Sequence, residues 1–120
     1  MKNFRDLKVW EKAHGVALAC YDVTRTYPRE EMFGLISQIR RAGASVPANI
    51  AEGCGRRGNG ELHRFLQMAM GSANELEYHL LLSRDLGYLR AETHKAVHEK
   101  LEEVKRMLAS LIRKVDSERA

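Results

Sequence analysis

Four long segments of the chain repeat apolar residues at spacings of three and four, and this pattern limits the fold more than any other feature. The segments span about residues 6–26, 30–54, 60–86 and 90–117. Such spacing places apolar side chains along one face of an α-helix. Because only a few residues join consecutive segments, neighbouring helices must run antiparallel. The pattern predicts an all-α, antiparallel up-down-up-down four-helix bundle, with residues 1–120 forming a single domain.

Each segment has its own expected core face. The predicted core residues are Leu7, Trp10, Ala13, Ala17, Cys20, Tyr21 and Thr24, then Met32, Leu35, Ile39, Val46 and Ile50, then Leu62, Phe65, Leu66, Ala69, Ala73, Leu76 and Leu80, and finally Val97, Leu101, Val104, Leu108, Leu111 and Val115. Apolar residues outside these faces are candidates for contacts between copies of the chain, namely Val9, Val16, Met68, Met70, Tyr78 and Leu82.

Proline and glycine residues mark the ends and irregularities of the segments. Pro28 ends the first one, because the residue before a proline is pushed out of the helical conformation. Gly87 suits a left-handed helix cap, and the stretch CGRRGNG at 54–60 predicts a flexible basic turn. Pro47 lies inside the second segment, where it removes a backbone donor and leaves the Gly43 carbonyl without its usual partner. We therefore expect a bend in this helix.

The net charge of the chain is +4, and the whole excess lies in its first half. Residues 1–64 contain 11 Lys and Arg against 7 Asp and Glu, whereas residues 65–120 contain 9 of each kind. A local basic surface is compatible with a polyanionic partner, and also with an ordinary solvated exterior. No apolar run is long enough to cross a bilayer, and the first residues lack the apolar stretch of a secretory signal. We expect a cytoplasmic protein without membrane contact.

The two cysteines are expected to be reduced thiols. If the first two helices pair about Pro28, Cys20 lies level with about residue 36. Cys54 is then about 18 residues further along, or roughly 27 Å away at 1.5 Å per residue. A disulfide needs Cα atoms within about 7 Å, so the spacing argues against one.

A polar stripe flanks the apolar face of the second helix. Its members are Gln38, Arg41, Ser45, Asn49 and Glu52. Pairing across the basic turn places Asn49 near Phe65 and Ser45 near Ala69, where the third helix carries small residues. One interpretation is a hydrogen-bonded seam that fixes helix register, because unpaired buried polar groups cost about 1–3 kcal/mol each. The other is a seam that forms a subunit contact or a binding groove.

Three stretches carry a resemblance to a known family. They are FRDLKVWEKA at 4–13, YPREEMFGLISQIRRAGASVPANIAEG at 27–53 and FLQMAMGSANELE at 65–77. They resemble the four-helix-bundle proteins encoded in intervening sequences of bacterial large-subunit (23S) ribosomal RNA genes, over nearly the whole chain. The residues at the family's motif positions are Arg40, Arg41, Ser45, Pro47, Asn49, Glu52 and Gly53. Gly43 stands where many relatives have alanine.

The resemblance implies a cytosolic homo-oligomer, with a five-fold ring as the known arrangement. One relative, the accessory variability protein of diversity-generating retroelements, forms a basic barrel that binds nucleic acid and a reverse transcriptase. For most members no biochemical function is established. The resemblance thus points to a pentamer with RNA or DNA as a candidate partner.

Arginines near the basic turn are the candidates for contact with nucleic acid. The candidate residues are Arg40, Arg41, Arg56, Arg57 and Arg64, with Arg5 and Lys8 as neighbours at the same end or flank. Aromatic residues make up only 7% of the chain, and the pattern assigns Trp10, Tyr21 and Phe65 to the core. We therefore expect contacts to the phosphate backbone that are largely independent of base sequence.

No cofactor or metal site is expected. Three pairs have helical ligand spacing, namely Glu11 with His14, Glu75 with His79, and His94 with His98. The second pair fits a surface contact and the third an exposed face, and the five histidines suggest no converging set.

The chain carries no catalytic motif, so we expect a protein that is not an enzyme. Cys54 lies near Arg56, which could lower its thiol pKa, but one thiol beside one arginine is not a mechanism. The alternative to nucleic-acid binding is a purely structural or scaffolding oligomer, or an adaptor for a protein partner.

Overall fold

The computed structural model describes residues 3–118. Its long helices are α1 (Lys8–Val23), α2 (Leu35–Cys54), α3 (Gly58–Asp85) and α4 (Ala91–Ser117). Three short 3₁₀ helices accompany them, η1 (Phe4–Asp6), η2 (Thr24–Thr26) and η3 (Arg29–Glu31). No strand occurs in this described range, and none of its helices is long and apolar enough to cross a membrane.

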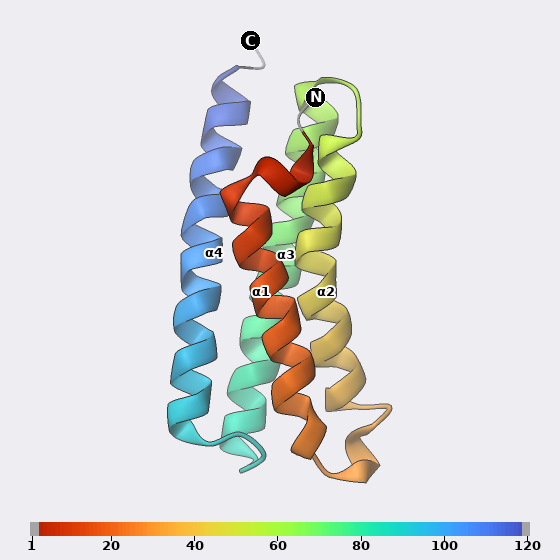
Figure 1. Cartoon of the computed structure of the whole chain (residues 1–120), viewed down its shortest axis with the longest axis vertical. Coiled ribbons are helices and arrows are strands. Elements are labelled where there is room, and N and C mark those ends of the chain that lie inside the picture. Colours follow the sequence, from red (N-terminus) through yellow and green to blue (C-terminus); the bar gives the residue numbers. More distant parts are fainter. Residues whose placement is uncertain (1–2, 119–120) are drawn as a thin grey trace.

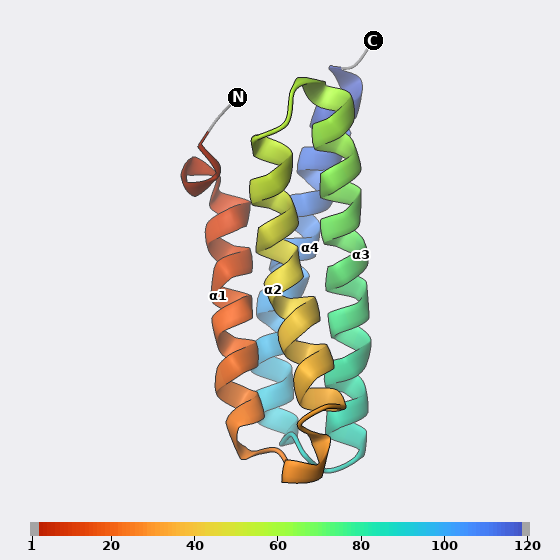
Figure 2. The ribbon, with the colours of Figure 1, turned by 90° about the vertical axis from the view of Figure 1, so that its right-hand side faces the viewer.

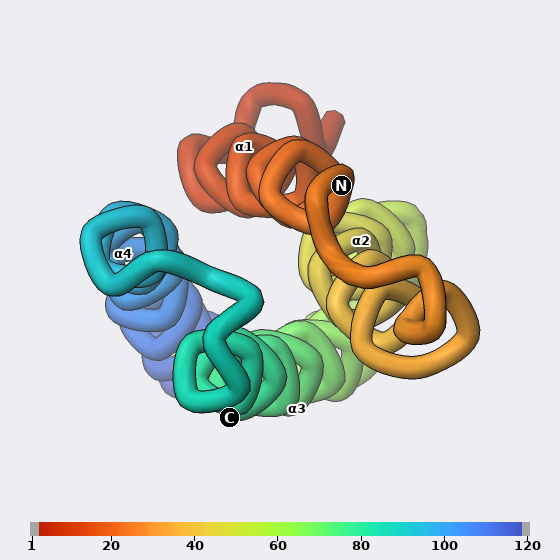
Figure 3. The backbone as a smooth tube through the Cα atoms, turned by 90° about the horizontal axis from the view of Figure 1, so that it is seen from below, coloured from red at the N-terminus to blue at the C-terminus, as the bar shows by residue number. Residues whose placement is uncertain are grey.

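The four α-helices alternate in direction along an elongated body of 48 × 24 × 20 Å (Figure 1). Each packs beside the next one in the chain, and α1 also packs against α4, which closes the ring of helices seen end-on in Figure 3. The α2–α3 pair shares the most extensive contact, and the two run side by side in Figure 2. The all-α four-helix bundle expected from the sequence is confirmed.

The predicted core faces of α3 and α4 are almost entirely correct. All seven residues expected in α3 are buried, from Leu62 to Leu80, and so are five of the six expected in α4, with Leu111 partly buried. The long stripes succeed because each of these helices packs against two neighbours.

Two core residues predicted in the first half of the chain are exposed instead. Tyr21 is 45% exposed and Met32 is 49% exposed. Conversely, Val9 and Val16, expected on an outer flank, are 4% and 1% exposed. In α1 the reason is that the helix packs against both α2 and α4, so it buries Val9 and Val16 as well as the predicted stripe. Met32 is exposed because it lies in the turn before α2 and not in a helix.

The second helix begins five residues later than predicted, at Leu35 rather than near residue 30. Residues before it form η3 and a turn that ends at Gly34, whose φ of −108° and ψ of −114° are not helical. Glu31 caps the helix from outside, because its Oε1 accepts a hydrogen bond of 3.1 Å from the Leu35 amide. Its Oε2 accepts one of 3.2 Å from the Tyr88 hydroxyl in the α3–α4 connection.

Glycines in α2 allow its neighbours to approach closely. A Cβ built on Gly43 would lie 2.8 Å from Cys20 Sγ, and one on Gly53 would lie 2.9 Å from Phe65 Cβ. Cys20 therefore packs level with Gly43 and not with residue 36 as predicted, because residues 24–34 form an irregular connection. Cys54 is still 11 residues from Gly43, or roughly 16 Å along the helix. Both thiols are free, as expected.

The register of α2 against α3 also differs by about one turn from the prediction. Ser45 contacts Ser72 and not Ala69, with 2.8 Å between the hydroxyl oxygens. The turn between the helices is shorter than expected, since α2 ends at Cys54 and α3 already begins at Gly58. Gly58 and Gly87 have positive φ angles of 80° and 85°, so Gly87 adopts the predicted left-handed conformation. The α2 helix continues through Pro47.

Candidate nucleic-acid interface and neighbouring polar clusters

A basic hollow lies at the end of the bundle where α2 turns into α3. It is an open depression of about 820 Å³, and Arg5, Arg56 and Arg57 all line it. Arg5 comes from η1 and the other two from the short turn between α2 and α3, so segments about 50 residues apart supply the charge. We call this region, with Arg64 beside it, the basic end.

Two of these arginines are held by carboxylates and by one aromatic ring. Arg56 donates to Glu52 at 2.9 Å, and Arg64 donates to Glu61 at 3.2 Å. Their guanidinium carbons lie 5.1 and 4.6 Å from the centroid of the Phe65 ring. The hydrogen bond from Arg64 lowers the pKa of Glu61. These contacts orient the arginines while leaving them exposed at the surface.

The N-terminus of α3 adds partial positive charge to the same region. Arg57 is the residue before the helix, and no side chain caps its first turn. The amides that open an α-helix lack carbonyl partners within it, and the helix dipole makes this end attractive to anions. Gly58, the first residue of α3, lines the basic hollow directly.

Arg40 and Arg41 lie far from this group. Arg40 lies 14 residues before the end of α2 at Cys54, or roughly 21 Å along the helix, and Arg56 follows in the turn. Its Nε donates to Thr24 Oγ1 at 2.9 Å, and its guanidinium lies 4.8 Å from the Tyr21 ring centroid. Arg41 is exposed. Lys8, exposed at the start of α1, lines a smaller hollow with Arg5. The candidate arginines therefore form two separate groups.

The polar stripe of α2 divides into a paired centre and exposed ends. The half-buried Asn49 side-chain amide donates to the Ser45 carbonyl and to Ser45 Oγ, both at 2.9 Å. Ser45 Oγ in turn contacts Ser72 Oγ of α3. Gln38, Arg41 and Glu52 are exposed. The centre of the stripe thus joins α2 to α3 within one chain.

An apolar groove runs between α1 and α2 on the outside of the bundle. Its lining is almost wholly apolar and includes Trp10, Leu18, Tyr21 and Pro47. Leu18 is 58% exposed. Phe33, in the turn before α2, is 92% exposed, and Met68 and Tyr78 of α3 are also exposed. The molecule therefore carries several large apolar side chains on its surface.

Both cysteine thiols have pKa values raised by burial. For Cys20 the pKa reaches about 12. Cys54 lines the basic hollow, yet burial raises its thiol pKa as well. The suggestion that Arg56 lowers this pKa is therefore wrong. Arg56 forms a hydrogen bond with Glu52, and the burial of the Cys54 thiol has the larger effect on its pKa.

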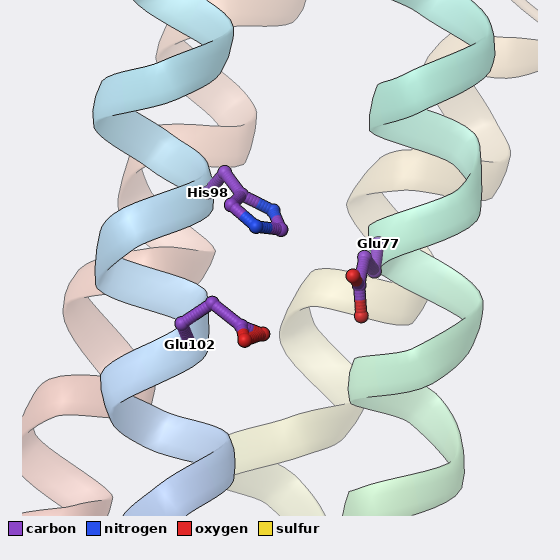
Figure 4. A group of neighbouring side chains, drawn as sticks. All are labelled: Glu77, His98 and Glu102. Carbon is purple, nitrogen blue, oxygen red and sulfur yellow. The ribbon is translucent and has the colours of Figure 1, made fainter.

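The structure brings together two carboxylates and one imidazole that the sequence analysis did not connect. Donor atoms of Glu77, His98 and Glu102 all lie within 4.8 Å of one another (Figure 4). His98 and Glu102 are one helical turn apart on α4, whereas Glu77 belongs to α3. Inspection of pairs within one helix cannot find a third ligand on another. The spacing of four between His98 and Glu102 was the signal available.

The other histidines have different surroundings. His94 is buried at 9% exposure, contrary to the prediction of an exposed face, and its ring stacks on that of His98. His79 contacts Glu75 at 3.1 Å, the surface contact that was expected. His14 stacks on Trp10 with 5.0 Å between ring centroids.

These features define a small four-helix-bundle protein with a basic end, an apolar groove and a joined α2–α3 interface. The model of the 23S rRNA-intervening sequence protein family matches residues 5–110, and the chain belongs to this family. The fold is similar to the crystal structure of a protein of unknown function from the S23 ribosomal protein family of Bacteroides thetaiotaomicron. That comparison has a TM-score of 0.82 and 27% sequence identity, and it covers 88% of this chain and 95% of the other. No curated protein matches the sequence.

Proposed function

We propose that the protein is a non-enzymatic, homo-oligomeric module that binds the phosphate backbone of RNA or DNA through its basic end. The observation that carries the proposal is the hollow in which Arg5, Arg56 and Arg57 meet beside the start of α3. Arginine side chains and free helix amides are both common ligands of phosphate. The basic hollow is open to solvent, which suits an extended polyanion better than a small enclosed ligand.

The chemistry of the basic end favours backbone contact over base recognition. Phe65 is buried and lies near the guanidinium groups of Arg56 and Arg64, so its ring is not offered to a base. Phe4 packs edge-on against Trp10 with 4.9 Å between centroids. Because these two rings at the basic end are already packed, binding there depends on charge and is largely indifferent to base sequence.

Self-association would strengthen this weak surface. Each protomer offers only a few arginines, and two of them are already paired with carboxylates. A closed ring repeats the basic end around its axis, and linked sites bind a long polyanion more tightly than one site does. The exposed apolar residues of the α1–α2 groove support a second copy of the chain as its occupant. The resemblance to ring-forming relatives favours a pentamer.

The first prediction concerns binding as a function of salt. Fluorescence anisotropy with labelled single-stranded RNA and DNA of mixed sequence should show affinity that falls steeply as NaCl rises. The slope of log affinity against log salt is about 0.7–0.9 per phosphate neutralised. The double variant Arg56→Gln/Arg57→Gln should weaken binding and reduce this slope.

The matched control is Arg29→Gln/Arg90→Gln, which removes two exposed arginines at the opposite end of the bundle. It changes the net charge equally and should retain binding with the slope of the parent protein. Absence of binding at low salt would reject the proposal. Equal losses in both double variants would show attraction by total charge and not by the basic end.

A scaffolding oligomer, or an adaptor for a protein partner, is the second candidate. The exposure of Leu18, Tyr21 and Phe33 favours it, because large apolar side chains gathered on a surface often mark protein contacts. An oligomer that binds neither RNA nor DNA at low salt would support this alternative.

A further inference from the structure

We propose that Glu77, His98 and Glu102 form a binding site for a divalent transition-metal ion, with Zn²⁺ as the best-fitting ligand. The site would join α3 to α4. It lies about 20 residues along α3 from the basic end, or roughly 30 Å, so it is independent of nucleic-acid binding.

The three side chains converge from two helices on one space. Figure 4 shows His98 and Glu102 projecting from α4 toward Glu77 of α3. His98 and Glu102 are four residues apart and therefore lie on one face of α4. The packing of α3 beside α4 brings Glu77 to the same place. All three are half-buried. Partial removal from water strengthens their attraction for a cation.

The donor set selects the kind of ion. One imidazole nitrogen and two carboxylate oxygens suit zinc and neighbouring first-row metals, whereas Mg²⁺ and Ca²⁺ prefer oxygen ligands alone. Ligand bonds to zinc are about 2.0–2.2 Å, which puts tetrahedral donors roughly 3.4 Å apart. The donor atoms here lie within 4.8 Å. Rotation of two flexible glutamate side chains can close this difference, and water would complete the coordination.

Lys105 already occupies the place of a cation in this cluster. Its ammonium donates to Glu77 Oε1 at 2.5 Å and lies 3.9 Å from Glu102 Oε1. The two carboxylates thus converge on a positive charge even without metal. A bound metal ion must displace this ammonium, so Lys105 competes for the site and sets its affinity. His94 stacks on His98 with 5.7 Å between ring centroids and steadies that ring.

The second prediction is metal binding by the apoprotein, measured by isothermal titration with ZnCl₂ and by thermal unfolding with and without zinc. We expect one Zn²⁺ per chain and a higher melting temperature, because a ligand of the folded state stabilises it. Mg²⁺ should produce neither effect. Glu77→Gln and His98→Gln should each lower zinc affinity by roughly tenfold or more, since even outer-shell partners of metals are worth that much.

Two further variants make the result specific. Lys105→Met should increase zinc affinity by removing the competitor, an effect that a merely structural role for Lys105 does not produce. His79→Gln is the matched control, because His79 and Glu75 form an equally spaced pair that no third ligand among residues 3–118 joins. Unchanged zinc binding in Glu77→Gln and His98→Gln would overturn the proposal. So would an equal loss in His79→Gln, or weaker binding in Lys105→Met.

Discussion

Gly53 contributes to the fold through the side chain that it lacks. It is buried near the end of α2, where a Cβ would lie 2.9 Å from Phe65 Cβ and 3.1 Å from Leu62 Cδ1. Phe65 Cβ is attached directly to the α3 backbone, so it cannot move aside without moving the helix. Gly71, in the middle of α3, has nothing within 4 Å of the same position. Two glycines in helix interiors therefore have opposite expected responses to a methyl group.

The third prediction compares alanine at these two positions. Gly53→Ala should lower the free energy of unfolding by about 1–3 kcal/mol, because overpacking at a close contact outweighs the gain in helix propensity. Gly71→Ala should raise it by about 0.5–1 kcal/mol, since only the propensity term operates there. Chemical denaturation followed by circular dichroism measures both. A stable Gly53→Ala variant would mean that α2 and α3 can separate slightly at little cost.

At the level of single residues, the close packing at Gly43 was not predicted. The sequence singles out Gly43 for the carbonyl that loses its partner to Pro47, whereas the structure also places the Cys20 sulfur 2.8 Å from where a Cβ on Gly43 would lie. Periodicity cannot distinguish these roles, because it contains no information on which neighbouring side chain faces a given position. The same limit explains why the third ligand-bearing residue, Glu77, was not connected to His98.

At the level of elements, helix existence was predictable and one helix start was not. The apolar stripes of α3 and α4 repeat for seven turns or so, which leaves little ambiguity. Before α2, the spacing of Met32 and Leu35 continues the helical pattern, yet the chain must first cross from α1. Glu31 decides the start by accepting from the Leu35 amide and from Tyr88, and its partner Tyr88 is remote in sequence.

The first turn of α4 carries the fourth prediction, a loss of stability in acid. Burial lowers the pKa of His94 in the folded protein, and the positive charges of Arg84 and His98 lower it further. The unfolded chain, with a pKa near 6.5, therefore binds a proton at a pH where the folded protein does not. The free energy of unfolding should fall as pH decreases below about 6.5 and level off below the lower folded pKa.

Urea denaturation at several pH values, with EDTA present to exclude metal effects, measures this change in the free energy of unfolding. His94→Gln should flatten the pH dependence of the unfolding free energy below about pH 6.5. His14→Gln, at an exposed position of α1, should leave that dependence unchanged. If His94→Gln retains the full slope, the loss of stability in acid originates elsewhere.

At the level of the whole molecule, the bundle and its shared core were predictable because short connections between long amphipathic helices permit few arrangements. The surface was less predictable. Val9 and Val16 face the core, while Tyr21 and Met32 do not, and the candidate arginines separate into two groups. The exposed side of a helix depends on how many neighbours it has, which the sequence of one helix does not state.

The fifth prediction concerns assembly. Light scattering coupled to size exclusion should give a mass several times that of one chain. Leu18→Glu should shift it toward the monomer, because a buried charge at a subunit contact is costly. Leu86→Glu changes a residue of similar exposure outside the α1–α2 groove and should leave the mass unchanged. A parent protein that is monomeric would remove the ring and its contribution to affinity.

An even number of antiparallel helices has a practical effect on how this protein can be handled. The start of η1 and the end of α4 both lie at the same end of the molecule as the turn between α2 and α3 (Figure 1). A purification tag or fluorescent fusion at either terminus would therefore be attached at the same end of the bundle as Arg56 and Arg57. A polyhistidine or acidic tag there would alter the local field that draws in phosphates, so titrations should use tag-free protein.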